Sequence, residues 1–228
     1  MKNIAVITAG GSGKRMRSAI KKQFMKIGND PVIVHTLRKF TASKLFAEII
    51  LVIPEEDVPE TENFIKKYFK NDKITLATGA DERQKSVFNG LKQCPPDTDY
   101  VFIHDGVRPF VDLEDLNLLL KKAKEIKAVI PVTPARCTIK KCRSGKVTET
   151  VPRDELFEAH TPQVFDFSLI SELHKKADEE GVILTDDAGI CEYYGHEVGI
   201  IESCGNNIKI THPQDIKIAE IILEAEKK

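Results

Sequence analysis

Short apolar runs alternate with longer segments of helical periodicity, and this alternation limits the possible folds more than any other feature of the sequence. Five runs have the length of a buried strand: 3–8 (NIAVIT), 48–54 (EIILVIP), 73–78 (KITLAT), 100–105 (YVFIHD) and 128–133 (AVIPVT). Strands that alternate with helices favour an α/β fold with a doubly wound, mostly parallel sheet. Because ligands bind beyond the carboxyl ends of the strands in such sheets, we expect the functional residues there.

The segments that follow these runs predict helices. They are 31–43, 56–70, 82–94 and 113–126, then 166–180, 186–194 and a last helix that begins near Pro213. Asp30 is expected to cap the first helix, with Pro31 in its first turn, and Thr185 is expected to cap the helix over 186–194. Two more strands are predicted near the end of the chain, over 197–203 and 207–211.

The pattern changes after the fifth apolar run. Residues 138–153 (TIKKCRSGKVTETVPR) predict a two-stranded hairpin whose turn is Ser144-Gly145. Because an isolated hairpin is only marginally stable in water, we expect this arm, residues 135–160, to pack on another surface such as a second subunit. No internal repeat or low-complexity linker interrupts the sequence, so residues 1–228 predict one domain with one projecting arm.

The composition narrows the class of protein. With 228 residues, of which 41% are hydrophobic and 30% charged, the chain is typical of a globular protein. A formal net charge of -1 gives no general attraction to nucleic acid or to an anionic membrane, so neither is an expected partner. The N-terminal apolar run is too short for a signal peptide or a membrane span. The five cysteines include no Cys-x-x-Cys pair, which favours reduced thiols and a cytoplasmic protein.

Residues 8–16 (TAGGSGKRM) form a glycine-rich segment directly after the first predicted strand. A Walker loop is excluded, because Thr8 occupies the place of the first glycine and Arg15 that of the magnesium-binding hydroxyl. The dinucleotide fingerprint is excluded because its third glycine is missing. The backbone N–H groups of such a loop suit a polyphosphate, and Lys14 and Arg15 add positive charge. The alternative is a tight turn without a ligand.

Other polar residues follow predicted strands or open predicted helices. Asp105 ends an apolar strand, where a carboxylate is costly unless it is paired. It would hold Mg²⁺ on phosphate oxygens or form an ion pair with Arg108, and the spacing alone favours neither. Lys21 and Lys22 follow the glycine-rich segment, as a second phosphate clamp or as an exposed pair. The acids that open the helices over 82–94 and 186–194 are explained by favourable placement at helix N-termini.

The candidate residues are cations, glycines and one aspartate, without an evident general base. No Ser-His-Asp set, metalloprotease helix or nucleophile elbow is present in the sequence. A phosphate monoester needs no base to act as a nucleophile, because its second pKa is about 6 and it is largely ionised at neutral pH. The enzyme then has to align two phosphates and neutralise the charge around the attacked phosphorus. This chemistry describes nucleotidyl transfer.

Six segments occur in the order found in the 2-C-methyl-D-erythritol 4-phosphate cytidylyltransferases of isoprenoid biosynthesis, and the resemblance covers essentially the whole chain. They are AGGSGKRM…KKQF, GADERQKSV.NGL, HDGVRPF, PR…HTPQ.F, TDDA and NIKIT.P.D. In that family the substrate phosphate attacks Mg²⁺-bound CTP, giving a CDP-alcohol and pyrophosphate. The resemblance implies a Rossmann-like nucleotidyltransferase fold and a homodimer formed through the 135–160 arm.

The resemblance also implies roles for individual residues. Arg15 and Lys22 would stabilise the pentacoordinate transition state. Arg153 and Lys209 would position the substrate phosphate, with Arg153 reaching across from the arm of the other subunit. The nucleotide would be held by Ala9, Gly10, Gly11, Ser12, Gly13, Asp81, Arg83 and Ser86. The polyol phosphate would contact Asp105, Arg108, Thr161 and Thr185, and Asp105 would also be the metal ligand.

Two features depart from the family pattern. Lys21 stands where the family usually has a proline before the catalytic lysine, so Lys21 and Lys22 are both candidates for that role. The opening Ala9-Gly10-Gly11 resembles the sister ribitol 5-phosphate cytidylyltransferases of teichoic acid synthesis, which represent the alternative function. An inactive regulatory module would be expected to lose the cations named above. A glycosyltransferase would be expected to carry an Asp-x-Asp motif after a predicted strand, and these segments contain none.

Overall fold

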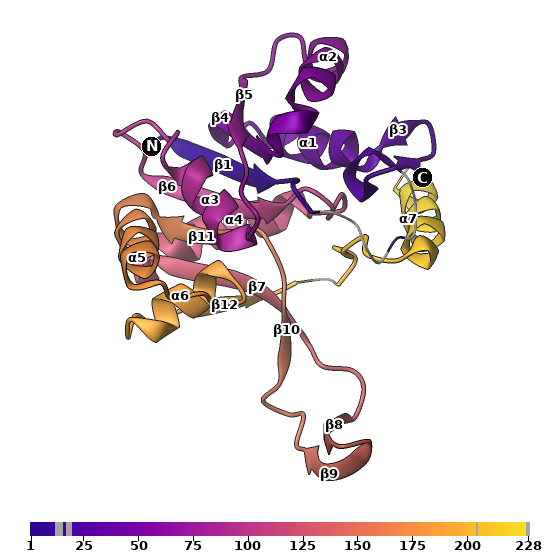
Figure 1. Ribbon diagram of the computed structural model, residues 1–228, viewed down its shortest axis with the longest axis vertical. Helices are drawn as coiled ribbons and strands as arrows, with labels where there is room; N and C mark the ends of the chain where they lie inside the picture. The colour runs from indigo at the N-terminus through magenta and orange to yellow at the C-terminus, as the bar shows by residue number, and fades with distance from the viewer. Residues whose placement is uncertain (12–15, 17–19, 204, 227–228) are drawn as a thin grey trace.

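The structure, a computed structural model, describes residues 1–11, 16, 20–203 and 205–226. Its main sheet has the strand order β10-β7-β11-β6-β1-β4-β5, with β12 also paired to β7 (Figure 1). The five apolar runs form β1 (Asn3–Thr8), β4 (Phe46–Ile53), β5 (Ile74–Thr78), β6 (Tyr100–Asp105) and β7 (Ala128–Pro134). β1 pairs in parallel with β4 and β6, and β5 pairs in parallel with β4. The prediction of a mostly parallel sheet is confirmed.

Two strands of the sheet have no counterpart among the predicted ones. β10 (Phe157–Ala159) runs antiparallel to β7, and β11 (Gln163–Asp166) runs antiparallel to both β6 and β7. β11 therefore separates two strands that the alternating pattern would place side by side. Both segments are short and β10 is exposed along its whole length, so neither produces an apolar run in the sequence.

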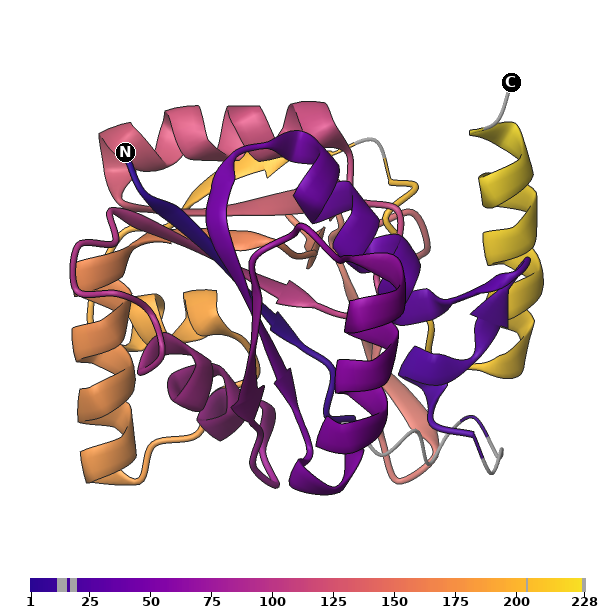
Figure 2. The ribbon, with the colours of Figure 1, turned by 90° about the horizontal axis from the view of Figure 1, so that it is seen from above.

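Helices cover both faces of the sheet (Figure 2). They are α1 (Val32–Ser43), α2 (Val58–Tyr68), α3 (Arg83–Leu91), α4 (Leu113–Ile126), α5 (Phe167–Glu180), α6 (Asp187–Tyr193) and α7 (Pro213–Ala225). Successive strand residues face opposite sides. Ile7 of β1 thus packs in a cluster with α1 and α4, whereas Val6 packs in one with α3, α5 and α6. α7 packs apart from the sheet, on β2 (Lys26–Ile27).

The ends of two helices differ from the predictions. Asp30 does not cap α1: it lies with Pro31 in the short strand β3 (Asp30–Pro31), the helix begins at Val32, and the Asp30 carboxylate pairs with Arg38. Thr185 does not cap α6, because Asp186 is the capping residue and its carboxylate accepts from the N–H of Gly189 at 3.0 Å. α1 has no side-chain cap, and the N–H of Val32 in its first turn donates to the carbonyl of Met25 at 2.8 Å.

The strand predicted over 197–203 is present as β12 (Gly199–Glu202), parallel to β7, but the one predicted over 207–211 is absent. Residues 207–211 lie beside the loop that comes after β6, and the N–H of Ile210 donates to the carbonyl of Val107 in that loop at 2.9 Å. The side chain of Ile210 is fully buried against the α7 cluster. The alternating apolar pattern here thus reflects packing beneath α7 instead of membership of the sheet.

The predicted hairpin is present and projects from the body of the protein (Figure 1). β8 (Ile139–Arg143) and β9 (Lys146–Val151) pair antiparallel, and the turn residues Ser144 and Gly145 have φ values of 50° and 75°. Positive φ at both central residues is the geometry of a tight two-residue hairpin turn. Nearly every residue of the hairpin is exposed, including the apolar Ile139 and Val147.

Among the described residues, no helix combines the length and apolar character needed to cross a membrane.

Candidate functional site: a cavity at the carboxyl ends of the strands

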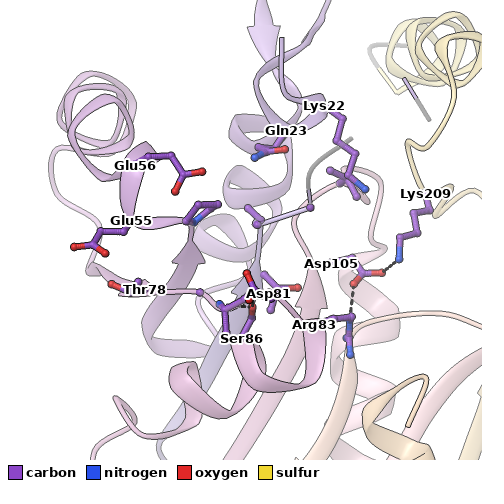
Figure 3. Close-up of a pocket in the computed structure, with 18 residues that line it drawn as sticks. Lys22, Gln23, Glu55, Glu56, Thr78, Asp81, Arg83, Ser86, Asp105 and Lys209 are labelled. Atoms are coloured by element: carbon purple, nitrogen blue, oxygen red, sulfur yellow. Dashed lines mark hydrogen bonds and ion pairs between the residues drawn. The ribbon is translucent and has the colours of Figure 1, made fainter. Parts of the chain in front are cut away.

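A cavity of about 570 Å³ lies where the carboxyl ends of β1, β4, β5 and β6 meet (Figure 3). Its lining comes from the start of the glycine-rich segment, the turn after β5, the first turn of α3, the end of β6, Lys22 and Lys209. The predicted convergence of these loops is therefore confirmed for the residues that the structure describes. The candidates that line the cavity are Ala9, Gly10, Gly11, Lys22, Asp81, Arg83, Ser86, Asp105 and Lys209. Ser12, Gly13, Lys14 and Arg15 lie outside the described residues.

The glycine-rich segment lets a lysine side chain approach its backbone closely. A Cβ atom on Gly11 would lie 3.0 Å from Cε and 3.2 Å from Nζ of Lys22, which is closer than most real Cβ contacts. Glycine at this position therefore allows the Lys22 ammonium to lie directly beside backbone N–H groups that can face a phosphate. Lys22 begins a short 3-10 turn, η2 (Lys22–Phe24), and its side chain extends to the cavity (Figure 3).

Lys21 is directed to a different group of residues. Its Nζ lies 2.8 Å from both carboxylate oxygens of Asp57 and 3.0 Å from Oε1 of Glu56, and Lys21 does not line the cavity. Burial by itself would lower the pKa of Lys21, but hydrogen bonds to Asp57 and Glu56 raise it above its ordinary value. Of the two adjacent lysines, Lys22 is thus the one placed at the cavity.

Ser86 organises the turn after β5. Its Oγ accepts from the N–H of Ala80 at 2.9 Å and lies within hydrogen-bonding distance of the carbonyls of Ala80 and Glu82, at 3.1 and 3.0 Å. Gly79 fits tightly here, because a Cβ atom would lie 3.3 Å from that Oγ and 3.4 Å from the carbonyl oxygen of Ile53. The turn is therefore held in one conformation with its exposed edge toward the cavity.

Asp105 is the most strongly paired carboxylate at the cavity. Nζ of Lys209 lies 2.8 Å from its Oδ2, Nε of Arg83 lies 3.1 Å from its Oδ1, and Nε of Arg108 lies 3.4 Å from Oδ2. Burial alone would raise the pKa of this carboxyl, but the charges of Arg83, Lys209 and Arg108 hold the pKa far below its ordinary value. Asp105 is thus an anion that gathers three cations, including the partner Arg108 proposed from the spacing.

Arg83 connects this cluster to a buried network that the sequence did not reveal. Its Nη1 lies 2.8 Å from Oδ2 of Asp187, and Oδ1 of Asp187 lies 3.1 Å from Nε2 of His174. Asp187 and His174 are almost completely buried. Burial lowers the pKa of Arg83 by itself, but Asp187 and Asp105 raise it well above its ordinary value. These partners lie on three different helices, so no local sequence pattern connects them. The signal in the sequence was the acid at position 187, which its place at a helix N-terminus already explained.

A second cavity, of about 490 Å³, adjoins the first, and Lys209 lines both. It carries the cations Arg108 and Arg136 as well, with His160 and the single acid Glu158. Arg108 is held in place by the carbonyl of Asn207, to which its Nη1 donates at 2.8 Å. Sequence reasoning assigned no role to either Arg136 or His160. Arg136 is an isolated cation without a motif around it, whereas His160 opens the HTPQ segment, which was the available signal.

Three of the predicted site residues that the structure describes line neither cavity. Thr161 is buried, and its Oγ1 accepts from the N–H of Asp105 at 3.2 Å, so it fixes the backbone of Asp105 without reaching the cavity. Thr185 is exposed at the start of α6. Arg153 is exposed at the base of the arm, where its Nη1 donates to the carbonyl of Arg136 at 2.6 Å.

A mostly parallel sheet with helices on both faces, and a glycine-lined cavity with facing cations at the ends of its strands, are the features of a Rossmann-like nucleotidyltransferase. The sequence pattern of the family described as IspD, 2-C-methyl-D-erythritol 4-phosphate cytidylyltransferase, matches residues 3–225. The chain belongs to this family.

Relatives and solved structures agree with the family. The chain is 41% identical over 223 residues to the 2-C-methyl-D-erythritol 4-phosphate cytidylyltransferase of Bacillus licheniformis, covering 98% of this chain and 96% of that protein. It is 43% identical over 225 residues to that of Clostridioides difficile, covering 98% and 94%. The crystal structure of 4-diphosphocytidyl-2C-methyl-D-erythritol synthase from Anaerococcus prevotii superposes with a TM-score of 0.86 at 33% identity, covering 98% of this chain and 96% of that one.

Proposed function

We propose that this protein transfers the cytidylyl group of CTP to 2-C-methyl-D-erythritol 4-phosphate, in non-mevalonate isoprenoid biosynthesis. The products are 4-diphosphocytidyl-2-C-methyl-D-erythritol and pyrophosphate. Family membership supports this reaction, and one observation carries it: two adjoining cavities share Lys209, so two phosphate groups can meet at one ammonium group. The ribitol 5-phosphate alternative is not favoured, because the relatives named above carry the methylerythritol phosphate name.

The first cavity suits the nucleotide. Gly10, Gly11 and Lys22 lie at one end, where backbone N–H groups and an ammonium group would face the triphosphate. The turn that carries Asp81 and the hydroxyl of Ser86 border the other end, where the nucleoside would lie. Ser12, Gly13 and Arg15, outside the described residues, are proposed to complete the phosphate end.

The second cavity suits the polyol phosphate, and the reaction follows from the meeting of the two substrates. An oxygen of the substrate phosphate forms a bond to the α-phosphorus of CTP. The bond from that phosphorus to the oxygen that bridges to the β-phosphorus breaks, and its electron pair leaves with pyrophosphate. The attacking phosphate is already ionised, so the residues act electrostatically: Lys22, Lys209 and Arg15 would neutralise the charge that builds up on the phosphoryl oxygens.

Mg²⁺ is proposed to enter with CTP. The described residues contain no group of three or more His, Cys, Asp or Glu side chains that would hold a metal ion by themselves. Asp105 is ionised at the edge of the cavity. Its Oδ2 faces both Lys209 and Arg108, but its Oδ1 pairs with Arg83 and keeps a second lone pair, so Asp105 fits as one ligand of an ion held mainly by phosphate oxygens. When bound, the ion would supply positive charge to the triphosphate.

We also propose a homodimer in which the arm of each subunit covers the site of the other. The arm exposes Ile139, Val147 and Phe157, and Arg153 at its base lines neither cavity of its own chain. A partner that packs on these apolar side chains would stabilise the hairpin. An isologous dimer would then place each Arg153 near the substrate phosphate of the other subunit.

A cytoplasmic location is proposed as well. The four described cysteines are free thiols, with Cys94 and Cys191 buried and Cys137 and Cys142 exposed on the arm. Free surface thiols are typical of a reducing compartment.

Pyrophosphate release tests the reaction. The protein is incubated with CTP and Mg²⁺ and with either 2-C-methyl-D-erythritol 4-phosphate or D-ribitol 5-phosphate. We expect release with the first substrate and release at least about a hundredfold slower with the second, since buried polar groups left unpaired by the wrong polyol cost specificity. Faster release with ribitol 5-phosphate would assign the chain to the alternative function.

Mixed dimers test the role of Arg153. Arg153→Ala and Arg15→Ala homodimers are each expected to be nearly inactive. If Arg153 acts across the interface, a heterodimer of the two holds one site with both lesions and one with neither. Activity should then return to about half of the wild-type value per dimer. Verified subunit exchange without recovered activity would show that Arg153 acts within its own chain.

A further inference from the structure

The ion pairs of Lys21 join two sides of the nucleotide cavity. Lys21 precedes η2, which carries Lys22 at the cavity, whereas Asp57 ends the short turn η3 (Glu55–Asp57) that follows β4. The Lys21 ammonium contacts both oxygens of Asp57 and one oxygen of Glu56. Glu55 and Glu56 line the same cavity as Lys22 (Figure 3). The contact thus links the segment that carries Lys22 to the opposite rim.

This pairing is better placed than an ordinary surface ion pair. The side chain of Asp57 is only 10% exposed and that of Lys21 is 32% exposed, so water screens the contact less than at an open surface. Asp57 is itself fixed, because its N–H donates to the carbonyl of Pro54 at 3.0 Å in a turn that leads into α2. The rim therefore offers Lys21 a rigid anchor.

The backbone explains why fixing Lys21 affects Lys22. Lys21 has φ of -60° and ψ of 138°, close to polyproline II, so its side chain and that of Lys22 leave the backbone in different directions. Lys21 turns toward the rim and Lys22 toward the cavity and Gly11. The carbonyl of Lys21 also accepts from the N–H of Phe24 at 2.9 Å, which closes the η2 turn. Movement of Lys21 would therefore move the start of the turn that carries Lys22.

We propose that Lys21 is a positioning residue, which through its ion pairs with Asp57 and Glu56 holds the backbone of Lys22 so that the Lys22 ammonium stays beside Gly11. The proposal rests on the proposed role of Lys22 in the transfer. Lys21 makes no contact with substrate in this arrangement. Its effect on the reaction passes through Lys22, whose ammonium must lie within a fraction of an ångström of its place to stabilise the transition state.

The test is a set of double mutants assayed for pyrophosphate release. Lys21→Met keeps most of the side-chain length but removes the ion pairs. We expect it to lower kcat about tenfold with a smaller change in the KM for CTP, because the loss falls on a transition-state contact. The matched control is Lys66→Met. It removes a lysine of α2 that pairs with Glu62 and is far more exposed than Lys21, and it should leave kcat unchanged.

In a Lys22→Gln background, Lys21→Met should cause no further loss of kcat, because the residue it positions has gone. An equal tenfold loss in both backgrounds would overturn the proposal. If Lys22→Gln alone leaves kcat unchanged, the proposed role of Lys22 fails and the proposal fails with it, a result distinct from additivity.

A second cycle works even if Lys22→Gln has no measurable activity. Asp57→Asn should reproduce the loss caused by Lys21→Met, and the double variant should be no slower than either single one. Multiplied losses would show that the two residues act independently and would overturn the proposal. Thermal melting of every variant confirms that the loss is measured on folded protein, since a general structural defect would lower the melting temperature without a selective fall in kcat.

Discussion

A buried histidine beside the site should make the protein's stability depend on pH. His104 is completely buried in β6, and its Nε2 lies 3.0 Å from the carbonyl of Arg108. A carbonyl only accepts, so Nε2 carries the proton. Nδ1 then accepts from the hydroxyl of Thr161 at 3.0 Å, and Thr161 in turn accepts from the N–H of Asp105. The neutral imidazole therefore completes a chain of hydrogen bonds that ends at Asp105.

Burial lowers the pKa of His104 from 6.5 to about 4. Between these values the unfolded chain binds a proton that the folded protein does not, so the free energy of unfolding falls as the pH decreases through this window. At 1.36 kcal/mol per pH unit the whole window is worth about 3 kcal/mol, of which about 2 kcal/mol is lost between pH 7 and pH 5. Above about pH 7.5 His104 contributes no pH dependence. Burial also lowers the pKa of His160, which adds a loss of the same sign.

Urea unfolding followed by circular dichroism at pH 7 and pH 5 measures this loss, and circular dichroism suits a chain without tryptophan. The comparison variant is His104→Gln, which cannot titrate. We expect it to be less stable than the wild type at pH 7 by about 1–3 kcal/mol, because one buried hydrogen bond is left incomplete. Its stability should nevertheless fall by about 2 kcal/mol less between the two pH values. Equal losses in both proteins would refute the assignment of a buried neutral imidazole.

Three further results are expected. Lys22→Ala should lower kcat by about 10²–10³-fold, because one preorganised charge is lost from the transition state. Lys21→Ala should lower kcat far less. If pyrophosphate release is slower with Lys21→Ala than with Lys22→Ala, the two lysines have been misassigned. The acid limb of kcat/KM should lie near about pH 6, the second ionisation of a phosphate monoester, and a substrate analogue with a lower second pKa should move the limb down by the same amount. Asp187→Ala should lower the free energy of unfolding by about 3–5 kcal/mol, because Arg83 loses a buried partner. Asp186→Ala removes the neighbouring helix cap and should lower it by only about 1 kcal/mol. Similar melting temperatures for the two variants would contradict this expectation.

The central strands could be predicted because each is buried on both faces. Every residue of β1 from Asn3 to Ile7 is buried. A strand that is buried on both faces needs apolar side chains at successive positions, and such a run is visible in the sequence. The site could be located for a related reason: parallel strands end at one edge, so the segments that follow them must meet. β10 and β11 produce no such apolar run. β11 has only four residues, and β10 pairs with β7 through its backbone while its side chains stay exposed.

Long-range pairs set the limit of what the sequence could predict in the site. Arg83 and Asp187 are 104 residues apart, and the acid at 187 fits the start of a helix well enough to need no other explanation. Asp105 illustrates the same limit. The spacing to Arg108 suggested one ion pair, but Lys209 and Arg83 also pair with it, and neither is near it in sequence.

The roles of the two adjacent lysines, Lys21 and Lys22, depend on the fold and not on the local sequence. Their side chains have the same charge and the same length, and the backbone at Lys21 requires only that they point in different directions. Which lysine faces the cavity depends on Asp57, which lies 36 residues further along the chain and binds Lys21 from the rim of the cavity. A carboxylate at that rim would repel a triphosphate unless a cation neutralised it. Lys21 is therefore held at this rim by Asp57 and Glu56, whereas the side chain of Lys22 lies at the cavity.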